Sequence, residues 1–313
     1  MAEVTASMVK TLREMTGVGM MDCKNALKET DGDLDKAVEV LREKGLAKAA
    51  KKASRIAAEG ICAVNVSEDG RVASIVEVNS ETDFVAKNEK FTSYVARVAA
   101  EAATTDAKDI DEFLNKPWID DSAKTVSEEL SAQIAVIGEN LKIRRFEQLK
   151  SEDGFIESYV HQGGSKAILV QMVASERNDA ARECAKNVAM QICAMSPKYV
   201  SQAEVDQDFI ANEKEVLLAQ IKNDPKEASK PEKVIEGMIA GRIKKEMAEI
   251  CLNDQVYVKA EDGKQTVGQY VAQVAKANGI TLSVKRFVRY ETGEGLEKKN
   301  ENFAEEVAKQ MGM

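Results

Sequence analysis

The sequence predicts an α+β protein in which an N-terminal three-helix module precedes a duplicated core of two three-stranded antiparallel sheets with helices. Three observations predict this class. Apolar residues in the first fifty positions have helical spacing, a strand–turn–strand–helix pattern recurs at an offset of 94 residues, and a helix–strand pattern recurs at an offset of 141 residues. A helical-hairpin insertion in the second half and a C-terminal helix complete the predicted fold.

The N-terminal module is predicted over residues 1–45. A glycine-containing break ends its first helix, and the second helix starts at Met20. Asp33 is a suitable N-cap for the third helix, and Gly45 is expected to end that helix. Residues 46–59 then form a basic helical linker, whose cationic side chains more often face solvent than RNA.

The core is expected to consist of two equivalent halves, residues 60–150 and 151–292. In each half a strand, a turn, a second strand and a helix follow one another, with Gly60 and Gly154 opening the corresponding first strands. Short apolar segments can match by chance, but two constant offsets favour duplication. Each half therefore contributes three strands with helices on one face.

A helix–strand unit closes each half, since Leu141–Phe146 corresponds to Leu282–Phe287. The offset here is larger than the first by 47 residues, so the second half carries an insertion of about that length. We place the insertion at about 197–259, where two charged helical segments flank Asn223–Pro225 and indicate a projecting antiparallel hairpin. Residues 293–313 are predicted to form a C-terminal helical module.

Composition limits the partners and the compartment. The chain has 44 basic and 53 acidic residues and a net charge of −9, which disfavours direct binding to nucleic acid. Five cysteines, an odd number with no C-x-x-C pair, are typical of a reducing cytosol. The sequence shows no signal peptide and no apolar run near the ~20 residues of a membrane span, so we expect a cytoplasmic protein without a membrane partner.

Few catalytic designs are open to this chain, because histidine is scarce. His161 is the single histidine, which excludes histidine-based metal cages, and neither a phosphate-binding P-loop nor a dinucleotide-binding G-x-G-x-x-G is present. We therefore expect no catalytic site, no metal and no cofactor, and interpret the chain as a binding protein and not an enzyme. A cysteine hydrolase using Cys23 or Cys184 with His161, a chaperone-like scaffold and a ubiquitin-type adaptor remain as alternatives.

One loop stands out between the second strand and the helix of the first half. It contains Thr82, Asp83, Phe84 and Val85. In a generic loop of this kind Asp83 would cap the helix and Phe84 would pack inward. Loops beside a rigid sheet also concentrate binding residues, and a Phe presented there could be buried in a partner.

Several segments, in order along the whole chain, resemble bacterial translation elongation factor Ts. They are residues 16–27, Glu77–Asn79, Thr82–Asn88, Ile137–Asn140 with Arg144–Arg145, and Thr266–Gly268. The resemblance implies a guanine-nucleotide exchange factor that acts on elongation factor Tu in protein biosynthesis. It also implies that the N-terminal module is UBA-like, similar to ubiquitin-associated domains, and docks on the GTPase through Met20 and Met21, although the pattern alone favours core positions for both.

The resemblance assigns further residues. The Thr82–Val85 loop would dislodge Mg²⁺ from the partner, with Asp83 near the metal and Phe84 wedged between partner helices. Ile137 and Gly138 match an additional partner contact. His161 matches a histidine in the half that grips the partner's far domain, but here a Gln and two glycines follow it, where several relatives have a shorter turn. The helical insertion is also a candidate homodimer element.

Overall fold

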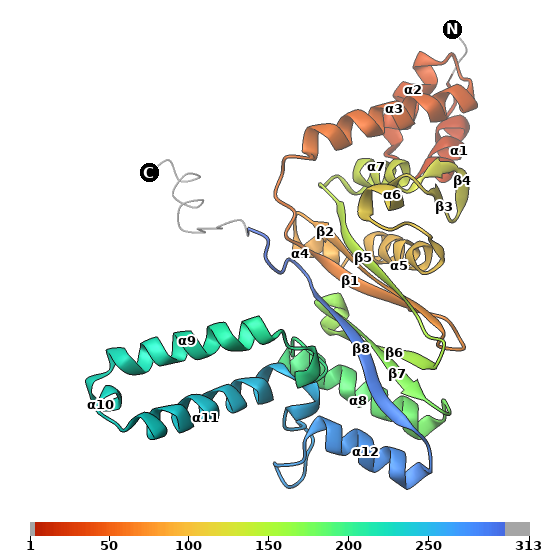
Figure 1. Ribbon diagram of the computed structural model, residues 1–313. Helices are drawn as coiled ribbons and strands as arrows, with labels where there is room; N and C mark the ends of the chain where they lie inside the picture. The colour runs from red at the N-terminus through yellow and green to blue at the C-terminus, as the bar shows by residue number, and fades with distance from the viewer. Residues whose placement is uncertain (1–3, 298–313) are drawn as a thin grey trace.

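The computed structural model describes residues 4–297, which form a helical module, a layered core and a projecting hairpin (Figure 1). The N-terminal module contains the three predicted helices α1 (Ala6–Thr16), α2 (Met20–Glu29) and α3 (Leu34–Lys52). The predicted C-terminal helix within residues 293–313 falls mainly on residues 298–313, which lie outside the described part of the chain.

The three N-terminal helices share a small apolar core of their own. Gly17 ends α1 in the left-handed conformation (φ +66°), and the Asp33 carboxylate caps α3 by accepting a hydrogen bond from the Lys36 N–H. The buried core residues are Val9, Leu12, Val18, Cys23, Ala26, Leu27, Ala37 and Leu41. Helices this short depend on such packing for most of their stability.

Helix α3 does not end at Gly45, so that part of the prediction is wrong. The helix continues to Lys52 and includes half of the segment expected to be a linker. Gly45 is buried, and a Cβ placed on it would lie 3.6 Å from the Cβ of Ala135 on α7 (Val126–Ile137). The glycine therefore marks a close approach between two helices and not a helix terminus.

The core has four layers, with one group of helices on the outer face of each of two stacked sheets (Figure 1). The first sheet has the order β1-β2-β5 and the second the order β6-β7-β8, and all neighbouring strands are antiparallel, as predicted. The strands are β1 (Glu59–Val66), β2 (Val72–Ser80), β5 (Lys142–Lys150), β6 (Gly154–His161), β7 (Lys166–Ala174) and β8 (Leu282–Glu291).

Helices α5 (Glu89–Thr104), α6 (Ile110–Leu114) and α7 cover the first sheet, and α8 (Asp179–Met195) and α12 (Val267–Asn278) cover the second. The inner faces of the two sheets meet in a dry layer. Its buried residues are Cys62, Ala73, Ile75, Leu149, Ile156, Ala167, Leu169, Val288 and Tyr290. This layer joins the two halves into one body.

Both sheets contain the same irregularity. The register shifts after Glu77 in β2 and after Gln171 in β7, at points where the third strands skip Arg144 and Lys285. These positions differ by 94 residues on the central strand and by 141 residues on the third strand, the two offsets found in the sequence. A β-bulge is a specific feature of a strand pair that is conserved within protein families. Its recurrence at equivalent positions therefore supports duplication independently of residue type.

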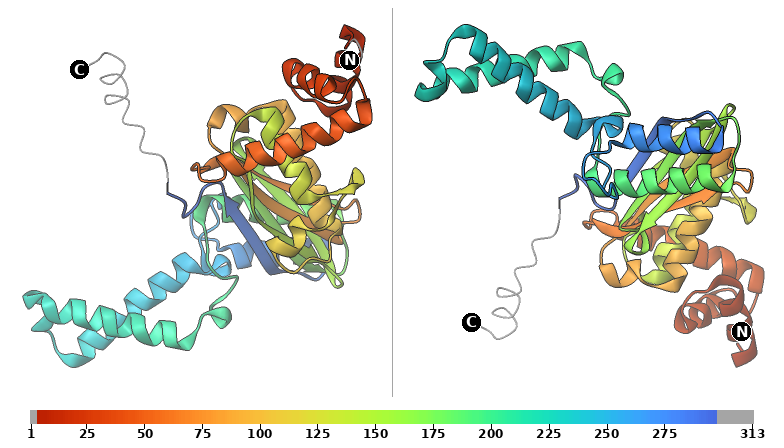
Figure 2. Two further views of the ribbon diagram at one scale, coloured as in Figure 1. Left: turned by 90° about the horizontal axis from the view of Figure 1, so that it is seen from above. Right: turned by 90° about the horizontal axis from the view of Figure 1, so that it is seen from below.

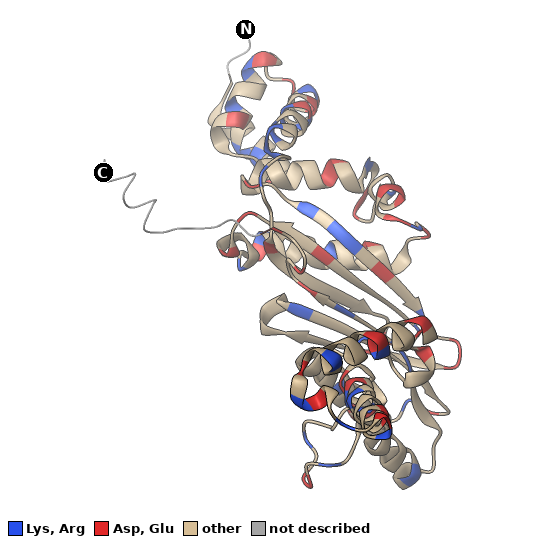
Figure 3. Ribbon diagram, turned by 60° about the vertical axis from the view of Figure 1, so that its left-hand side comes forward, with Lys and Arg blue, Asp and Glu red and all other residues tan. Residues whose placement is uncertain are grey.

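The helical insertion projects from the second half, which all three ribbon views show (Figures 1 and 2). It consists of α9 (Gln207–Asn223), α10 (Pro225–Ala228) and α11 (Glu232–Ile250), with short 3₁₀ turns on either side at Gln202–Glu204 and Leu252–Asp254. Figure 3 shows basic and acidic residues interspersed over the described ribbon, including this hairpin. None of the helices within residues 4–297 combines the length and apolar character needed to cross a bilayer.

A small two-stranded sheet was not predicted. It pairs β3 (Pro117–Trp118) with β4 (Asp121–Thr125) beside the first half. Strands of two and five residues are too short to show alternation in sequence, which explains the omission.

A buried carboxylate joins the two sheets near one edge. Glu77 on β2 has no solvent exposure and accepts hydrogen bonds from Arg144 Nη1 (3.0 Å), Arg145 Nε (2.6 Å), Asn79 Nδ2 (3.0 Å) and the Gly293 N–H (2.8 Å). Gly293 follows β8, so the carboxylate of the first sheet holds the segment that leaves the second sheet. We call these five residues the Glu77 cluster.

Burial alone would raise the pKa of Glu77. The hydrogen bonds from the Gly293 N–H and Asn79, together with the two guanidinium groups, outweigh burial and hold that pKa below its usual value. Glu77 is therefore ionised at neutral pH although it is fully enclosed.

Candidate functional site

The loop after β2 presents an aromatic side chain to solvent. Thr82 caps the short helix α4 (Asp83–Ala86), its Oγ1 accepting from the Val85 N–H. Phe84 is 82% exposed, more than any other large apolar side chain in residues 4–297, whereas Val85 packs on the first-half core. The generic expectation for this loop is wrong on both points, because Thr82 and not Asp83 is the cap and Phe84 points outward.

A negative charge accompanies the exposed ring. The Asp83 carboxylate lies 2.6 Å from Lys87 Nζ, and the hydrogen bond from Lys87 holds the pKa of Asp83 below its usual value. Half of the Asp83 side chain is still exposed. The loop therefore offers an ionised carboxylate next to an exposed aromatic ring.

The loop is braced by the turn between α7 and β5. The Glu139 carboxylate accepts hydrogen bonds from the Thr82 N–H (3.0 Å) and Thr82 Oγ1 (2.7 Å), and the Asn140 N–H donates to Glu81 (2.6 Å). Asn140 Nδ2 also donates to the Arg55 carbonyl at 2.8 Å, which ties in the segment after α3. Phe84 is thus exposed on a loop that several hydrogen bonds hold in place.

Sequence reasoning noted Glu81 only as a charged neighbour of Phe84 and Glu139 only within the Ile137–Asn140 segment, and it gave neither residue a bracing role. Both lie beside the predicted site residues in sequence, but their contacts join positions almost sixty residues apart. No periodicity or spacing in the sequence indicates hydrogen bonds between two segments so far apart. An acidic residue directly after a helix-ending glycine was the only local signal.

Ile137 and Gly138 lie at the same brace. Ile137 is partly buried against the first-half core, and Gly138 ends α7 in the left-handed conformation (φ +88°). Gly138 is exposed, and its carbonyl accepts a hydrogen bond from Lys52. Because Glu139 comes next, the structure places these two predicted contact residues beside the Thr82–Val85 loop.

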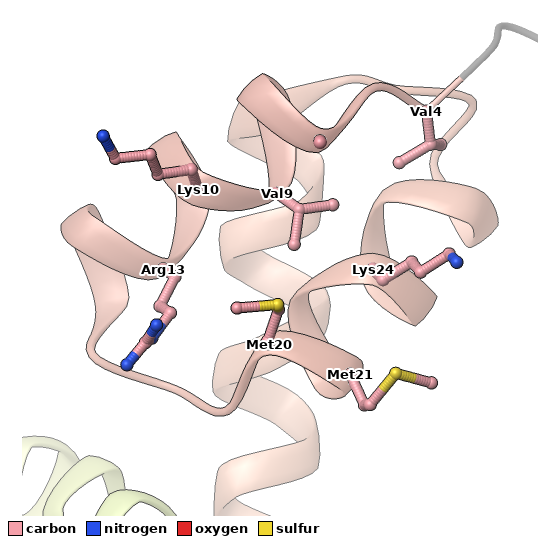
Figure 4. Close-up of a pocket in the computed structure, with 8 residues that line it drawn as sticks. Val4, Val9, Lys10, Arg13, Met20, Met21 and Lys24 are labelled. Carbon is pink, nitrogen blue, oxygen red and sulfur yellow. The ribbon is translucent and has the colours of Figure 1, made fainter.

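Met20 and Met21 lie on the N-terminal module. They are 57% and 66% exposed, so the pattern-based expectation of core positions is wrong. With Val4 and Val9 they line a shallow cleft of about 310 Å³ between α1 and α2. Figure 4 shows Met20 extending between Val9 and Arg13. Three cations, Lys10, Arg13 and Lys24, also line this cleft.

His161 ends β6, and its Nδ1 lies 2.9 Å from the Tyr159 hydroxyl. The following turn has positive φ at both Gln162 and Gly163, and it packs on the first half, where a Cβ on Gly164 would lie 2.9 Å from the Cys62 carbonyl. The turn therefore lies near the start of β1. That end of β1 pairs with the end of β2 that leads into the Thr82–Val85 loop.

The residues of the hydrolase alternative do not come together. Cys23 is buried in the N-terminal module and Cys184 in the second-half core, and neither forms a hydrogen bond with His161. Burial raises the pKa of Cys184 to about 12, so its thiol stays protonated. Within residues 4–297 no three His, Cys, Asp or Glu side chains are grouped to hold a metal ion.

Comparisons with known proteins agree with each other. Residues 81–294 match the family model described as elongation factor TS. Curated proteins named elongation factor Ts align over almost the full length. That of Clostridioides difficile is 50% identical over 99% of this chain and all of its own, and those of Clostridium novyi and Clostridium tetani are each 49% identical over 98% of this chain and 99% of theirs.

Proposed function

The chain belongs to the elongation factor Ts family, and from this premise we propose that it is a guanine-nucleotide exchange factor for elongation factor Tu. It binds the GDP-loaded GTPase, disturbs the Mg²⁺ site and promotes GDP release during translation elongation. The observation that carries the proposal is Phe84, a fully presented aromatic side chain on a loop braced at both Thr82 and Glu81.

The mechanism is a wedge that lowers the affinity for nucleotide. A GTPase that binds GDP·Mg²⁺ with nanomolar affinity holds it by about 12 kcal/mol, so unassisted release is slow. Mg²⁺ neutralises phosphate charge and orders the surrounding loops. Burial of Phe84 between partner helices displaces those loops, and the ionised Asp83 carboxylate disturbs the metal's coordination. By reciprocity the nucleotide weakens the factor's binding by the same free energy.

Three further sets of residues contact the partner. Met20 and Met21, on the UBA-like module, supply an apolar contact whose cationic rim suits an acidic helix. Ile137 and Gly138 extend the surface of the Thr82–Val85 loop, and His161 contacts the partner from the second half. Separate anchors of this kind orient the wedge before it inserts.

We further propose that the chain breaks no covalent bond, binds no nucleic acid directly and acts in the cytoplasm. A translation factor works where the ribosome is, and the net charge of −9 opposes binding to phosphate backbones. The homodimer through α9–α11 stays a prediction, supported by the exposed Val216 and Val234 on the hairpin. Sedimentation at micromolar concentration should show a dimer that a hairpin deletion abolishes, and a monomer at all concentrations would contradict it.

The exchange proposal predicts a large kinetic effect. Elongation factor Tu loaded with a fluorescent GDP analogue is mixed in a stopped-flow instrument with excess unlabelled GDP, with and without this chain. Release should accelerate by orders of magnitude and should saturate with the concentration of the chain. A release rate that the chain leaves unchanged would reject the exchange function and favour the scaffold alternative.

A further inference from the structure

Helices α3 and α7 pack against each other along one face of each helix. We call this contact the α3–α7 stripe. Arg42 forms an ion pair with Glu128, Gly45 faces Ala135 and the Ser131 carbonyl, and the Lys52 ammonium donates to the Gly138 carbonyl. The α3 members follow spacings of three and seven residues and the α7 members spacings of three, four and three, so each set occupies one helix face. The contact runs the length of α7.

This contact joins the N-terminal module to the core. Val136, also on α7, packs against the module's apolar core and lies 3.9 Å from where a Cβ on Gly17 would be. Next to it lies a cleft of about 340 Å³ that is lined by residues of both parts, among them Gly17, Tyr94 and Trp118. The α3–α7 stripe is the most extensive contact between the N-terminal helices and the core.

The stripe ends at the functional loop. Gly138 is the last residue of the α3–α7 contact, and Glu139, which follows it, holds Thr82 through two hydrogen bonds. Met20 and Met21 begin α2, which packs on α3 and is tied to it by the Lys48–Asp22 ion pair, so α3 links the Met20–Met21 surface to the brace of the Phe84 loop. Gly138 and Glu139 are consecutive residues, so the helix pair and that brace adjoin directly.

We infer that α3 is a rigid connection that sets the Met20–Met21 surface relative to Phe84, and that Gly45 is the positioning residue that permits it. This inference rests on the proposed function. Two contacts held in fixed relation bind as one, because the second forms without a further loss of orientational freedom. A loosely attached module would have to find its contact separately for each encounter.

The size of residue 45 tests the connection. Gly45→Ala should be tolerated, since its Cβ meets Ala135 at 3.6 Å, an ordinary contact. Gly45→Leu should separate α3 from α7. We expect it to raise the concentration giving half-maximal GDP release about tenfold while the maximal rate stays unchanged. Ala47→Leu, which adds the same side chain at an exposed α3 position, is the matched control and should behave as the unmodified chain.

A distance measurement separates this inference from the exchange function. Spin labels at Lys28→Cys and Lys108→Cys, both exposed and on opposite sides of the boundary, should give a narrow distance distribution that Gly45→Leu broadens and Ala47→Leu does not. Ala135→Leu enlarges the α7 residue that faces Gly45 and should broaden the distance distribution in the same way. It replaces Gly45→Leu as the test variant if Gly45→Leu folds poorly.

The outcomes divide cleanly. An unchanged distribution in both bulky variants overturns the rigid connection, and a broadened distribution with an unchanged half-maximal concentration overturns its positioning role. Met20→Ala with Met21→Ala should cost less in the Gly45→Leu background than in the unmodified chain, and full additivity would also count against the inference. If no variant and no unmodified chain accelerates release, the exchange function fails, while the distance distribution still decides the connection.

Discussion

Replacing Phe84 by alanine is expected to slow factor-stimulated GDP release by about one to two orders of magnitude. A Phe side chain that moves from water into a partner contributes about 1.5–3 kcal/mol, and each 1.4 kcal/mol is about a factor of ten. Phe84 is 82% exposed in the free chain, so almost all of this burial is available for binding. Stopped-flow release at saturating factor measures the effect on the wedge step.

The same exposure supplies the control. Because Phe84 makes little contact within the chain, Phe84→Ala should leave the urea unfolding midpoint unchanged, and Phe84→Leu should retain part of the stimulation. Ile119→Ala removes an apolar side chain that is 39% exposed on the turn between β3 and β4, outside the proposed contacts, and should not alter release. Equal stimulation by Phe84→Ala and the unmodified chain would show that Phe84 has no role in GDP release.

The second large effect concerns stability. Glu77→Ala should lower the free energy of unfolding by about 3–5 kcal/mol, because it leaves Arg144 and Arg145 partly buried without a counter-charge and removes the acceptor of the Gly293 N–H. Glu77→Gln keeps the size and one acceptor and should cost less. Urea unfolding followed by circular dichroism measures both losses.

Glu147→Ala is the matched control for that substitution. Glu147 lies on the neighbouring strand β5 and pairs with Arg286 in an exposed ion pair. Removing such a pair should cost about 1 kcal/mol or less. If Glu77→Ala costs no more than Glu147→Ala, the buried Glu77 cluster stabilises the fold no more than an exposed ion pair does, and the prediction is wrong.

The pH dependence gives a second readout of the same cluster. The folded-state pKa of Glu77 is lower than the unfolded value of about 4.3. The ionised carboxylate therefore stabilises the fold at pH values above that unfolded value, and the contribution is lost as the pH falls through the folded pKa. Stability should decline on acidification below about pH 4, and Glu77→Gln should flatten this decline.

Most of the fold could be predicted because duplication leaves a signal in sequence. The offsets of 94 and 141 residues placed all six core strands and the helical insertion, and the structure repeats those offsets in its two bulges. The failure at Gly45 has a physical cause. A buried glycine that lets two helices approach looks the same in sequence as a glycine that ends a helix, and only the facing Ala135 distinguishes them.

The site was predicted less completely. The resemblance named the Thr82–Val85 loop, but the direction of Phe84 depends on the cap at Thr82, and that cap is fixed by Glu139 from another element. Hydrogen bonds between distant segments have no sequence period. The roles of Glu81, Glu139 and Lys52 therefore came only from the structure.

The segments that follow β2 and β7 occupy equivalent places in the duplicated core but differ in their surroundings. Arg177 stands 94 residues after Asp83 and lies at the corresponding place in the second half. Its guanidinium donates to the Glu68 carbonyl at 2.6 Å and lies against Gly70, so it ties the second half to the turn between β1 and β2. In the first half, Asp83 and Phe84 follow the corresponding strand end and are exposed to solvent instead. The same position of the repeat is thus an internal contact in the second half and an exposed surface, free to be covered, in the first.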